Sequence, residues 1–527
     1  MMDLTPVRRY FEAVAPLETR AVTRSMLNGS VFFDDDGESR HYDAIRQRLS
    51  SARCCTKIIV VGSSTPCGKG SVGVGAGKGR TKFATAPGVR AAGGTSGAWP
   101  RRLQEMLNNV TRHCCPEGHH LDNHCRDSTG IDFQLQTFDE RLSPELQSAR
   151  AAGKPADLVV VDTTSVDFNL LWMKAHKMDS RSLKEERHNA TRLDLEAFLR
   201  RFLAVPHAPG LAFAETAWLD NSAMGRTGTK GEQFGAWIDH APILRHYGVP
   251  AVAMPVALEA QGMPASQSAP VTLEKMPLAR KFMYVDGLHL SRAGHWMFAF
   301  FVANAIFGGG RAHEGTSARH LPARFATELP APVASMEQLV PRMSKKQTYF
   351  DFTSTQRAEG ALSQLRGVRG WAWKLLEKVD GKYIAFDPRD PKRATSSVVM
   401  DHGKLGLMAS WEPEPTPAPT FEATVKLSLG TLQFGYLRSY EGRADARIDV
   451  WACNQRNGRA TGQLPVHSEI LNGSWEMPIS IYTSHVMDLR TASVVPRAGG
   501  CSLDLRVTML PGASGAGDFT IYTIASY

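Results

Sequence analysis

The chain has 527 residues, of which 43% are hydrophobic and 21% are charged. This length and composition predict a globular protein with two domains and extensions, and they exclude an intrinsically disordered chain. The net charge of +9 comes from 61 Lys and Arg against 52 Asp and Glu. Because this excess is modest and forms no basic stripe beside aromatic residues, we expect no nucleic-acid partner.

Targeting signals are sparse. No apolar run reaches the roughly 18 residues that a spanning helix needs, so we expect no spanning membrane segment in this chain. The first 20 residues lack the apolar core of a secretory signal. Eight cysteines and the sequons at Asn28, Asn109, Asn189 and Asn472 nevertheless favour the secretory route and a glycoprotein. The compartment and the oligomeric state stay open.

The first half of the chain predicts an α/β domain. Residues 1–53 form a polar N-terminal extension, and residues 54–310 alternate apolar runs with segments of helical spacing. Such alternation predicts a parallel sheet covered by helices on both faces. The expected strands are Lys57–Gly62, Asp157–Asp162, Leu211–Trp218 and Ala251–Met254, the last of which follows the segment Ala241–Tyr247. The expected helices are Trp99–Val110, one within Ile131–Leu146, Leu193–Leu203 and Trp296–Phe307. The Gly-, Lys- and Ala-rich stretch 68–97 predicts a surface insertion.

The second half predicts an antiparallel β-sandwich. Residues 311–346 contain Pro and Ala and form a linker, and residues 347–527 show apolar and polar residues in strict alternation between Gly and Pro turns. The Pro-rich stretch 412–419 is expected to be a surface loop. Aromatic residues of this accessory domain are either buried or form a sugar-stacking platform. They are Trp371, Trp373, Tyr436, Tyr440, Trp451 and Trp475.

A candidate nucleophile follows the first expected strand. Ser64 lies within the stretch Gly62–Gly68, at the carboxyl edge of the sheet, where α/β folds bind their ligands. The stretch differs from a phosphate-binding loop, because five residues separate Gly62 from Gly68 and Gly70 takes the Ser/Thr position. A plain turn serine is the competing interpretation.

Asp286 and His289 are the candidate acid and base. A serine nucleophile needs a base within hydrogen-bond reach and an anion that orients the base. Asp286-Gly-Leu-His289 offers both on one turn, directly before an apolar helix. The order of Gly-x-Ser after an early strand and Asp-x-x-His before the last helix favours a catalytic triad over chance.

These motifs resemble the SGNH/GDSL hydrolase superfamily over about residues 57–307. Gly62-Ser63-Ser64 is similar to its first block, and Asp286-Gly-Leu-His289 with Gly294-His295 is similar to its fifth. The resemblance implies a three-layer α/β/α, flavodoxin-like domain. It also implies ester hydrolysis through an acyl-serine intermediate, without a cofactor.

The resemblance further implies an oxyanion hole made by the amides of Ser64 and Gly130 and by an Asn side chain after a buried strand. Here Asp167 falls nearest to the expected position, and Asn169 lies two residues on. An ionised Asp cannot donate to an oxyanion and would repel it. Either Asn169 serves, or the hole is incomplete.

The stretch His113–Cys125 is dense in residues that can bind metals. It has no zinc-site spacing, so disulfides or a His-rich surface loop are expected instead, and no metal site is predicted.

Together these motifs predict a serine esterase, with an acylated glycan as one possible substrate. Two alternatives stay open. One is a weakened or inactive relative that binds a glycan or a protein partner, and the other is an O-acyltransferase with the same triad.

Overall fold

A computed structural model gives the structure of the chain, which divides into two units, Met1–Ser335 and Met336–Tyr527. The finer division into an extension, a hydrolase-like domain, a linker and a sandwich stays a prediction. The structure describes residues 5–15, 22, 27, 31–32, 40–68, 97–126, 129–164, 166–167, 181–216, 237–254, 257, 289–307, 329–344, 346–353, 355–379, 382–386, 404–411, 417–438, 444–451, 464–473, 481–492, 501–511 and 517–527.

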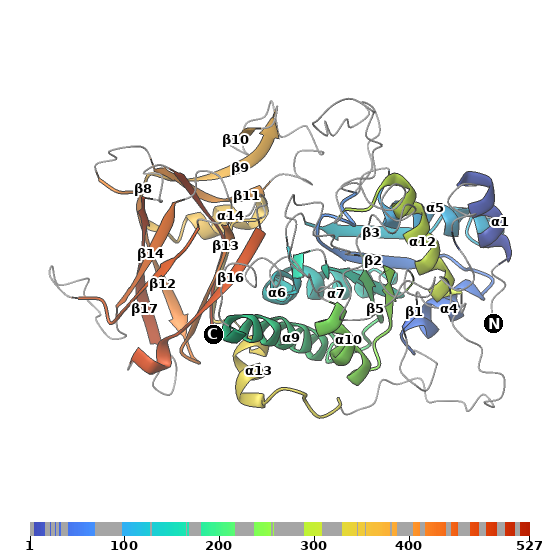
Figure 1. The fold of residues 1–527 in the computed structure, drawn as a ribbon, viewed down its shortest axis with the longest axis horizontal. Coiled ribbons are helices and arrows are strands. Elements are labelled where there is room, and N and C mark those ends of the chain that lie inside the picture. The colour runs from blue at the N-terminus through green and yellow to red at the C-terminus, as the bar shows by residue number, and fades with distance from the viewer. Residues whose placement is uncertain are drawn as a thin grey trace. The chain divides into compact units, whose positions relative to one another are not determined.

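The first unit is built on a sheet with the order β1-β6-β5-β4-β2-β3 (Figure 1). All its pairings are parallel except β1 with β6. The chain therefore starts in the middle of the parallel strands, moves to one edge and returns to build the other side, as in flavodoxin-like folds. The strands are β1 Val31–Phe32, β2 Lys57–Gly62, β3 His120–Cys125, β4 Leu158–Asp162, β5 Gly210–Glu215 and β6 Ala251–Ala253.

Helices cover both faces of this sheet, so the predicted three-layer α/β/α fold is confirmed (Figure 1). Helices α1, α5 and α12 pack together on one side, and α6, α9 and α10 pack together on the other. The bounds in the first unit are α1 Thr5–Val14, η1 Arg40–Tyr42, α4 Asp43–Leu49, α5 Trp99–Val110, α6 Ile131–Gln136, η2 Phe138–Leu142, α7 Ser143–Ala151, α9 Arg181–Leu203, α10 Trp237–His246 and α12 Arg292–Ile306.

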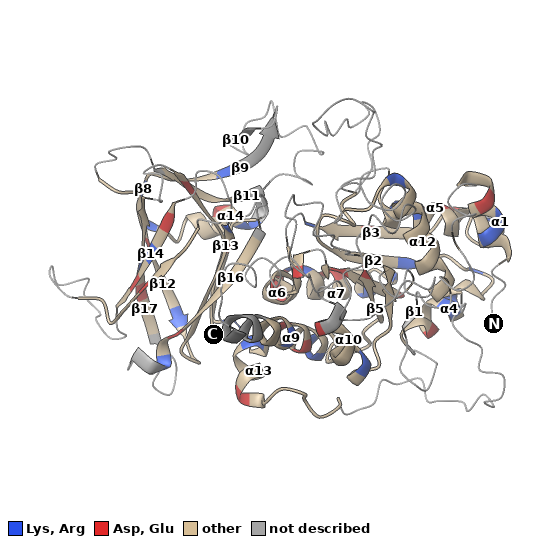
Figure 2. Ribbon diagram, in the orientation of Figure 1, with Lys and Arg blue, Asp and Glu red and all other residues tan. Residues whose placement is uncertain are grey.

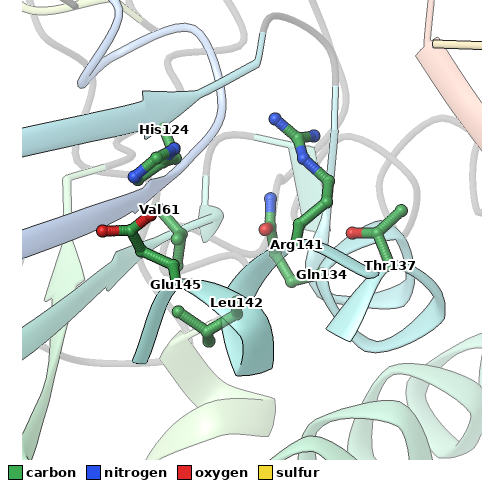
Figure 3. Close-up of a pocket in the computed structure, with 7 residues that line it drawn as sticks. All are labelled: Val61, His124, Gln134, Thr137, Arg141, Leu142 and Glu145. Carbon is green, nitrogen blue, oxygen red and sulfur yellow. The ribbon is translucent and has the colours of Figure 1, made fainter. Parts of the chain in front are cut away.

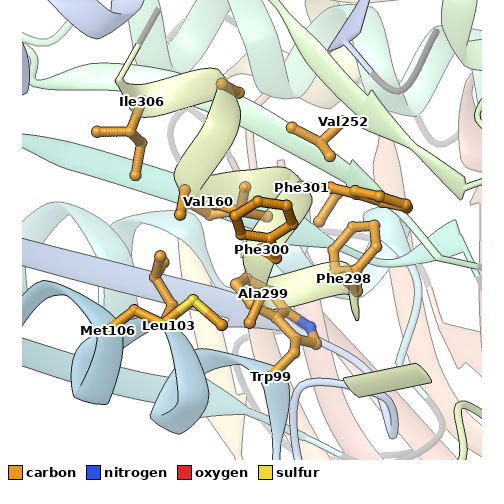
Figure 4. Close-up of a cluster of buried hydrophobic side chains, with 14 of the residues drawn as sticks. Trp99, Leu103, Met106, Val160, Val252, Phe298, Ala299, Phe300, Phe301 and Ile306 are labelled. Atoms are coloured by element: carbon orange, nitrogen blue, oxygen red, sulfur yellow. The ribbon is translucent and has the colours of Figure 1, made fainter. Parts of the chain in front are cut away.

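The main core of this unit lies between the sheet and the layer that contains α5 and α12 (Figure 4). Helix α12 is apolar around most of its circumference, and its residues from Gly294 to Ile306 are all buried. The Ser291 hydroxyl accepts from the Gly294 amide at 3.1 Å, which caps the start of this helix. The Arg46 guanidinium donates to the carbonyl oxygens of Ala305 and Ile306, which supplies hydrogen-bond donors to the last carbonyl groups of α12.

The N-terminal segment contributes to the same core. Helix α1 carries a strongly amphipathic pattern, and its Val7 and Phe11 are fully buried. The Phe11 ring stacks on Phe300 of α12, with ring centroids 4.5 Å apart. Tyr42 and Ile45 are fully buried beside them. Residues 1–53 thus supply part of the packed interior of the first unit.

Strand β3 occupies the stretch that the sequence predicts as disulfides or a His-rich loop, and part of that expectation is wrong. His120–Cys125 pairs in parallel with β2 at the edge of the sheet. The cysteines around it form disulfides, Cys54–Cys114, Cys55–Cys115 and Cys67–Cys125. An edge strand pairs on one side, and its side chains from Leu121 onward are partly buried, which explains why it lacks the apolar run of a central strand.

The second unit is the predicted β-sandwich. Its strands form a seven-stranded sheet with the order β10-β9-β11-β18-β13-β16, in which β7 also pairs with β18, and a five-stranded sheet with the order β15-β14-β17-β12-β8. All these pairings are antiparallel. Alternate residues of β12 are buried, as a half-covered strand requires. Linker residues 336–343 form helix α13.

The bounds in the second unit are α13 Met336–Met343, β7 Thr348–Asp351, α14 Thr355–Leu362, β8 Arg366–Arg369, β9 Trp371–Val379, β10 Lys382–Phe386, β11 Lys404–Trp411, β12 Thr420–Leu427, β13 Thr431–Arg438, β14 Asp445–Trp451, β15 His467–Leu471, β16 Ile481–Asp488, η6 Leu489–Ala492, β17 Cys501–Leu510 and β18 Gly517–Ser526.

The aromatic residues proposed as a sugar-stacking platform are mostly core residues. Trp371, Trp373, Tyr436 and Trp451 are all less than 9% exposed. Trp371 meets Phe421 edge to face, and Tyr436 stacks on Phe519. Since a sugar ring can stack only on an exposed face, these four cannot form the platform as they stand. Tyr440 and Trp475 lie outside the described residues.

Charged side chains of both signs are interspersed along the described elements of both units (Figure 2). Within the described part of the chain, no helix is long and apolar enough to cross a membrane. The predicted surface insertion is described only at Gly68 and Gly97, and residues 412–416 of the Pro-rich loop lie outside the described residues.

Candidate active site

Ser64 lies in a tight turn directly after β2. The Ser63 amide donates to the Asp162 carbonyl at 2.8 Å, and the Gly68 amide closes the turn on the Thr65 carbonyl at 2.9 Å. Gly62 has to be glycine, because a Cβ there would lie 2.3 Å from the Asp162 carbonyl oxygen. The turn therefore holds Ser64 at the carboxyl edge of the sheet, as the sequence predicts, with 4% of its surface exposed.

His289, which is distant from this serine along the sequence, contacts it in the fold. Its Nε2 lies 3.0 Å from the Ser64 Oγ, although 225 residues separate the two along the chain. Leu290 and the Ser291 cap lead directly into α12, so the buried helix anchors the histidine. Of the three predicted triad residues, the structure brings Ser64 and His289 together, and Asp286 lies outside the described residues.

The nucleophile turn is also tied to β3. The Cys67–Cys125 disulfide joins the end of the turn to the end of that strand. The Asn123 side chain donates to the Pro66 carbonyl at 2.7 Å. The Arg126 amide donates to the Gly62 carbonyl at 2.7 Å, and the Thr129 hydroxyl contacts the same oxygen at 3.4 Å. The loop that carries Gly130 therefore runs beside the serine turn.

Gly130 and Asp167, both predicted at the oxyanion hole, lie in contact. A Cβ on Gly130 would fall 2.4 Å from the Asp167 Oδ1, so this glycine makes room for the carboxylate. The same oxygen accepts from the Ile131 amide at 2.8 Å. Among the described residues, neither the Ser64 amide nor the Gly130 amide has a protein acceptor. Asn169 lies outside the described residues.

Two further buried carboxyl groups, Asp162 and Glu215, lie behind this edge of the sheet, and neither was predicted as a site residue. Asp162 ends β4 and accepts from the Trp99 indole and the Thr216 hydroxyl, each at 2.9 Å. Burial raises the pKa of Asp162 to about 8, against these hydrogen bonds, which lower it. A signal existed, because a polar residue closes an otherwise apolar strand there.

Glu215 ends β5 and binds His240 of α10. The His240 Nδ1 lies 2.8 Å from the Glu215 Oε1, and the Nε2 lies 3.5 Å from the Asp167 Oδ2. All three side chains are at most 2% exposed. Although burial alone would lower it, the negative charges of Glu215 and Asp167 raise the pKa of His240 to about 9. Burial raises the pKa of Asp167 to about 6, against His240, which lowers it.

These shifts predict that the first unit loses stability between pH 7 and pH 9. Asp162 and His240 titrate in the folded state near 8 and 9, but at 3.8 and 6.5 when unperturbed. The folded state thus keeps protons that the unfolded state has lost, and this stabilisation disappears as the pH rises through the folded values. We expect a loss on the order of 3 kcal/mol across this range.

Thermal unfolding followed by circular dichroism at pH 7, 8 and 9 measures this effect. The Asp162→Asn variant should show a weaker dependence, because its amide does not titrate. His119 and His124, whose pKa values burial lowers, are neutral in both states above pH 7 and do not contribute. A melting temperature that rises from pH 7 to pH 9 would contradict the prediction.

A separate cluster of metal-ligand types lies between β3 and α7. Ligand atoms of Asp122, His124 and Glu145 lie within 4.8 Å of one another, and Figure 3 shows His124 and Glu145 in the lining of a small pocket. The Lys57 ammonium contacts Asp122 at 3.1 Å and Glu145 at 2.9 Å. Although burial alone would lower it, hydrogen bonds to these carboxylates raise the pKa of Lys57. Both carboxylates are thus already paired with a protein cation.

Comparisons with known proteins give a fold and no family. No family model matches the chain, and no curated protein matches it. Among solved structures, a two-domain esterase active on acetylated mannans, crystallised with mannopentaose, aligns with a TM-score of 0.50 and 12% identity, over 95% of this chain and 97% of that chain. An acetylxylan esterase from Geobacillus stearothermophilus aligns with a TM-score of 0.29 and 12% identity, over 49% of this chain and 99% of that chain. At 12% identity, the two-domain structure shows a shared fold and nothing more.

Proposed function

We propose that the chain is a serine esterase that removes acyl groups from a carbohydrate. The observation that carries this proposal is the 3.0 Å contact between the Ser64 Oγ and the His289 Nε2. A neutral imidazole at that distance can take the hydroxyl proton as the serine attacks a carbonyl carbon. The position of the pair at the carboxyl edge of a flavodoxin-like sheet supports the same function.

The reaction then follows from the groups present. Ser64 attacks the ester carbon, and its proton passes to His289. The tetrahedral intermediate expels the alcohol, which takes that proton, and an acyl-serine remains. His289 then takes a proton from a water molecule, which attacks the acyl-serine. As the acid leaves, His289 returns this proton to the Ser64 Oγ. In this proposal Asp286 orients His289, and the amides of Ser64 and Gly130 bind the oxyanion.

An acetylated glycan is the substrate class that we favour. Over 95% of its length, the chain aligns in fold with an esterase active on acetylated mannans. The proposal needs no aromatic platform on the sandwich, where the described candidates are buried.

Acetate release tests the proposal. Purified full-length protein is incubated with p-nitrophenyl acetate, p-nitrophenyl octanoate, acetylated mannan and acetylated xylan, and the free acid is measured. We expect turnover of the acetyl ester and of at least one acetylated polysaccharide, and slower turnover of octanoate. Release of p-nitrophenol at the same rate by wild type and Ser64→Ala would refute an esterase. Turnover of the aryl ester without acetate from either polysaccharide would refute the substrate class alone.

A further inference from the structure

A buried carboxylate beside the oxyanion loop poses an electrostatic problem. Asp167 is 1% exposed and lies against the Cα of Gly130, the proposed oxyanion donor. The charge that forms on the substrate during acyl transfer is also negative. In a water-excluded site two such charges repel each other strongly, so an uncompensated Asp167 would oppose the reaction.

The structure supplies a counter-charge on the far side of Asp167. The Oδ1 faces the oxyanion loop and accepts from the Ile131 amide at 2.8 Å. The Oδ2 faces the His240 Nε2 at 3.5 Å, and among the described residues neither atom has a hydrogen-bond partner. The carboxylate therefore lies between the oxyanion loop and a buried imidazole.

His240 is held in this place by groups that favour its charged form. Its Nδ1 donates to Glu215 at 2.8 Å, and the other Glu215 oxygen accepts from the Thr164 hydroxyl at 2.7 Å. Asp239, the neighbour of His240 along α10, is engaged elsewhere, with Arg192 at 2.9 Å and His188 at 2.6 Å. The imidazole thus lies between two carboxylates, Glu215 and Asp167, and both attract a proton onto it.

We infer that His240 is a positioning residue, an imidazolium that offsets part of the Asp167 charge, so that this carboxylate can hold the Ile131 amide with less repulsion of the oxyanion. The inference rests on the proposed function, since it concerns the loop that binds the oxyanion. Glu215 keeps the imidazole charged and oriented. The Asp167 carboxylate then fixes the loop at Gly130 at a lower electrostatic cost to the reaction than it would have beside a neutral His240.

The test uses variants that separate charge from shape. His240→Asn keeps an amide where the Nδ1 binds Glu215 but removes the cation that faces Asp167. We expect kcat for p-nitrophenyl acetate to fall about 10- to 100-fold with KM nearly unchanged, because the loss affects the transition state. Asp167→Asn keeps an oxygen for the Ile131 amide and needs no cation, so its kcat should fall less than that of His240→Asn.

The double variant His240→Asn/Asp167→Asn gives the decisive comparison. Its kcat should recover to that of Asp167→Asn, because the carboxylate that required neutralisation is gone. His119→Asn is the matched control, since His119 is also a buried histidine, bonded to Thr56 and Thr111 away from Ser64. It should keep the wild-type kcat in its folded fraction.

Each outcome decides the inference. A double variant as slow as His240→Asn, or a loss that appears in KM alone, would overturn it. If His240→Asn does not fold, Asp167→Leu replaces it: this variant lacks the acceptor and should lose about 100-fold in kcat relative to Asp167→Asn. Equal kcat values for those two would overturn the inference. A wild-type protein without ester hydrolysis would overturn the proposed function, and with it this one.

Discussion

Replacing Ser64 with alanine is expected to lower kcat for ester hydrolysis by at least about 10⁴-fold. The reason is that the hydroxyl oxygen forms the covalent bond to the acyl group, and no other group can supply that oxygen. The residue is 4% exposed in a turn that backbone hydrogen bonds fix, so the loss of one oxygen should leave the fold intact. Stopped assays with p-nitrophenyl acetate measure the change, and circular dichroism checks the fold.

Three further variants sharpen this result. His289→Ala should lose a similar factor, and the Ser64→Ala/His289→Ala pair should lose little more, because the two groups act as a unit. Ser63→Ala is the neighbouring control: its contact to Asp162 comes from the backbone amide, which the substitution keeps. If Ser64→Ala retained more than a tenth of the wild-type kcat, Ser64 would not be the nucleophile.

Replacing Trp99 with alanine is expected to destabilise the first unit by about 4 kcal/mol. Trp99 is fully buried at the start of α5. Its ring packs edge to face against Phe298 of α12, with ring centroids 5.5 Å apart (Figure 4). Its loss leaves a cavity between these helices. It also removes the indole donor from Asp162, a buried carboxyl that would then have one donor fewer.

Trp99→Phe separates these two contributions. It keeps most of the ring but has no N–H, so we expect a loss of about 1–2 kcal/mol. Urea unfolding monitored by circular dichroism gives both values. Equal destabilisation by the two variants would mean that the hydrogen bond to Asp162, and not the packing volume, dominates. A loss below about 1 kcal/mol for Trp99→Ala would contradict the packing argument.

The sequence could predict the elements whose pattern is local. Lys57–Gly62 and Trp99–Val110 have the predicted bounds, because an apolar run before a glycine and an amphipathic period are each visible in a short window. Strand β3 was missed for a physical reason. Its sequence HLDNHC is polar, and pairing with β2 through the backbone requires no apolar side chain.

The residues of the candidate site also differ in whether a local sequence pattern marks them. Ser64 and His289 could be proposed because each adjoins a recognisable boundary, the end of β2 and the start of α12. His240 could not, because it lies within a helix and acquires its surroundings from the segment after β4 and the end of β5. Its role depends on contacts between residues 25 or more positions apart, which no local pattern records. Asp286 and Asn169 stay predictions.

The three disulfides around β3 have a consequence for how β3 aligns with β2. In this ladder Lys57 pairs with His120 and Gly62 pairs with Cys125. The bonds Cys54–Cys114 and Cys55–Cys115 lie before the first of these pairs, and the Cys67–Cys125 bond lies at the last. Crossed pairing of Cys54 with Cys115 would suit a slip of one residue, which would turn every β3 side chain to the opposite face. The Cys67–Cys125 bond fixes the pairing of β2 and β3 at the far end of the ladder, and it therefore disfavours that slip. Production in a reducing compartment would remove this check, so the host should offer an oxidising one.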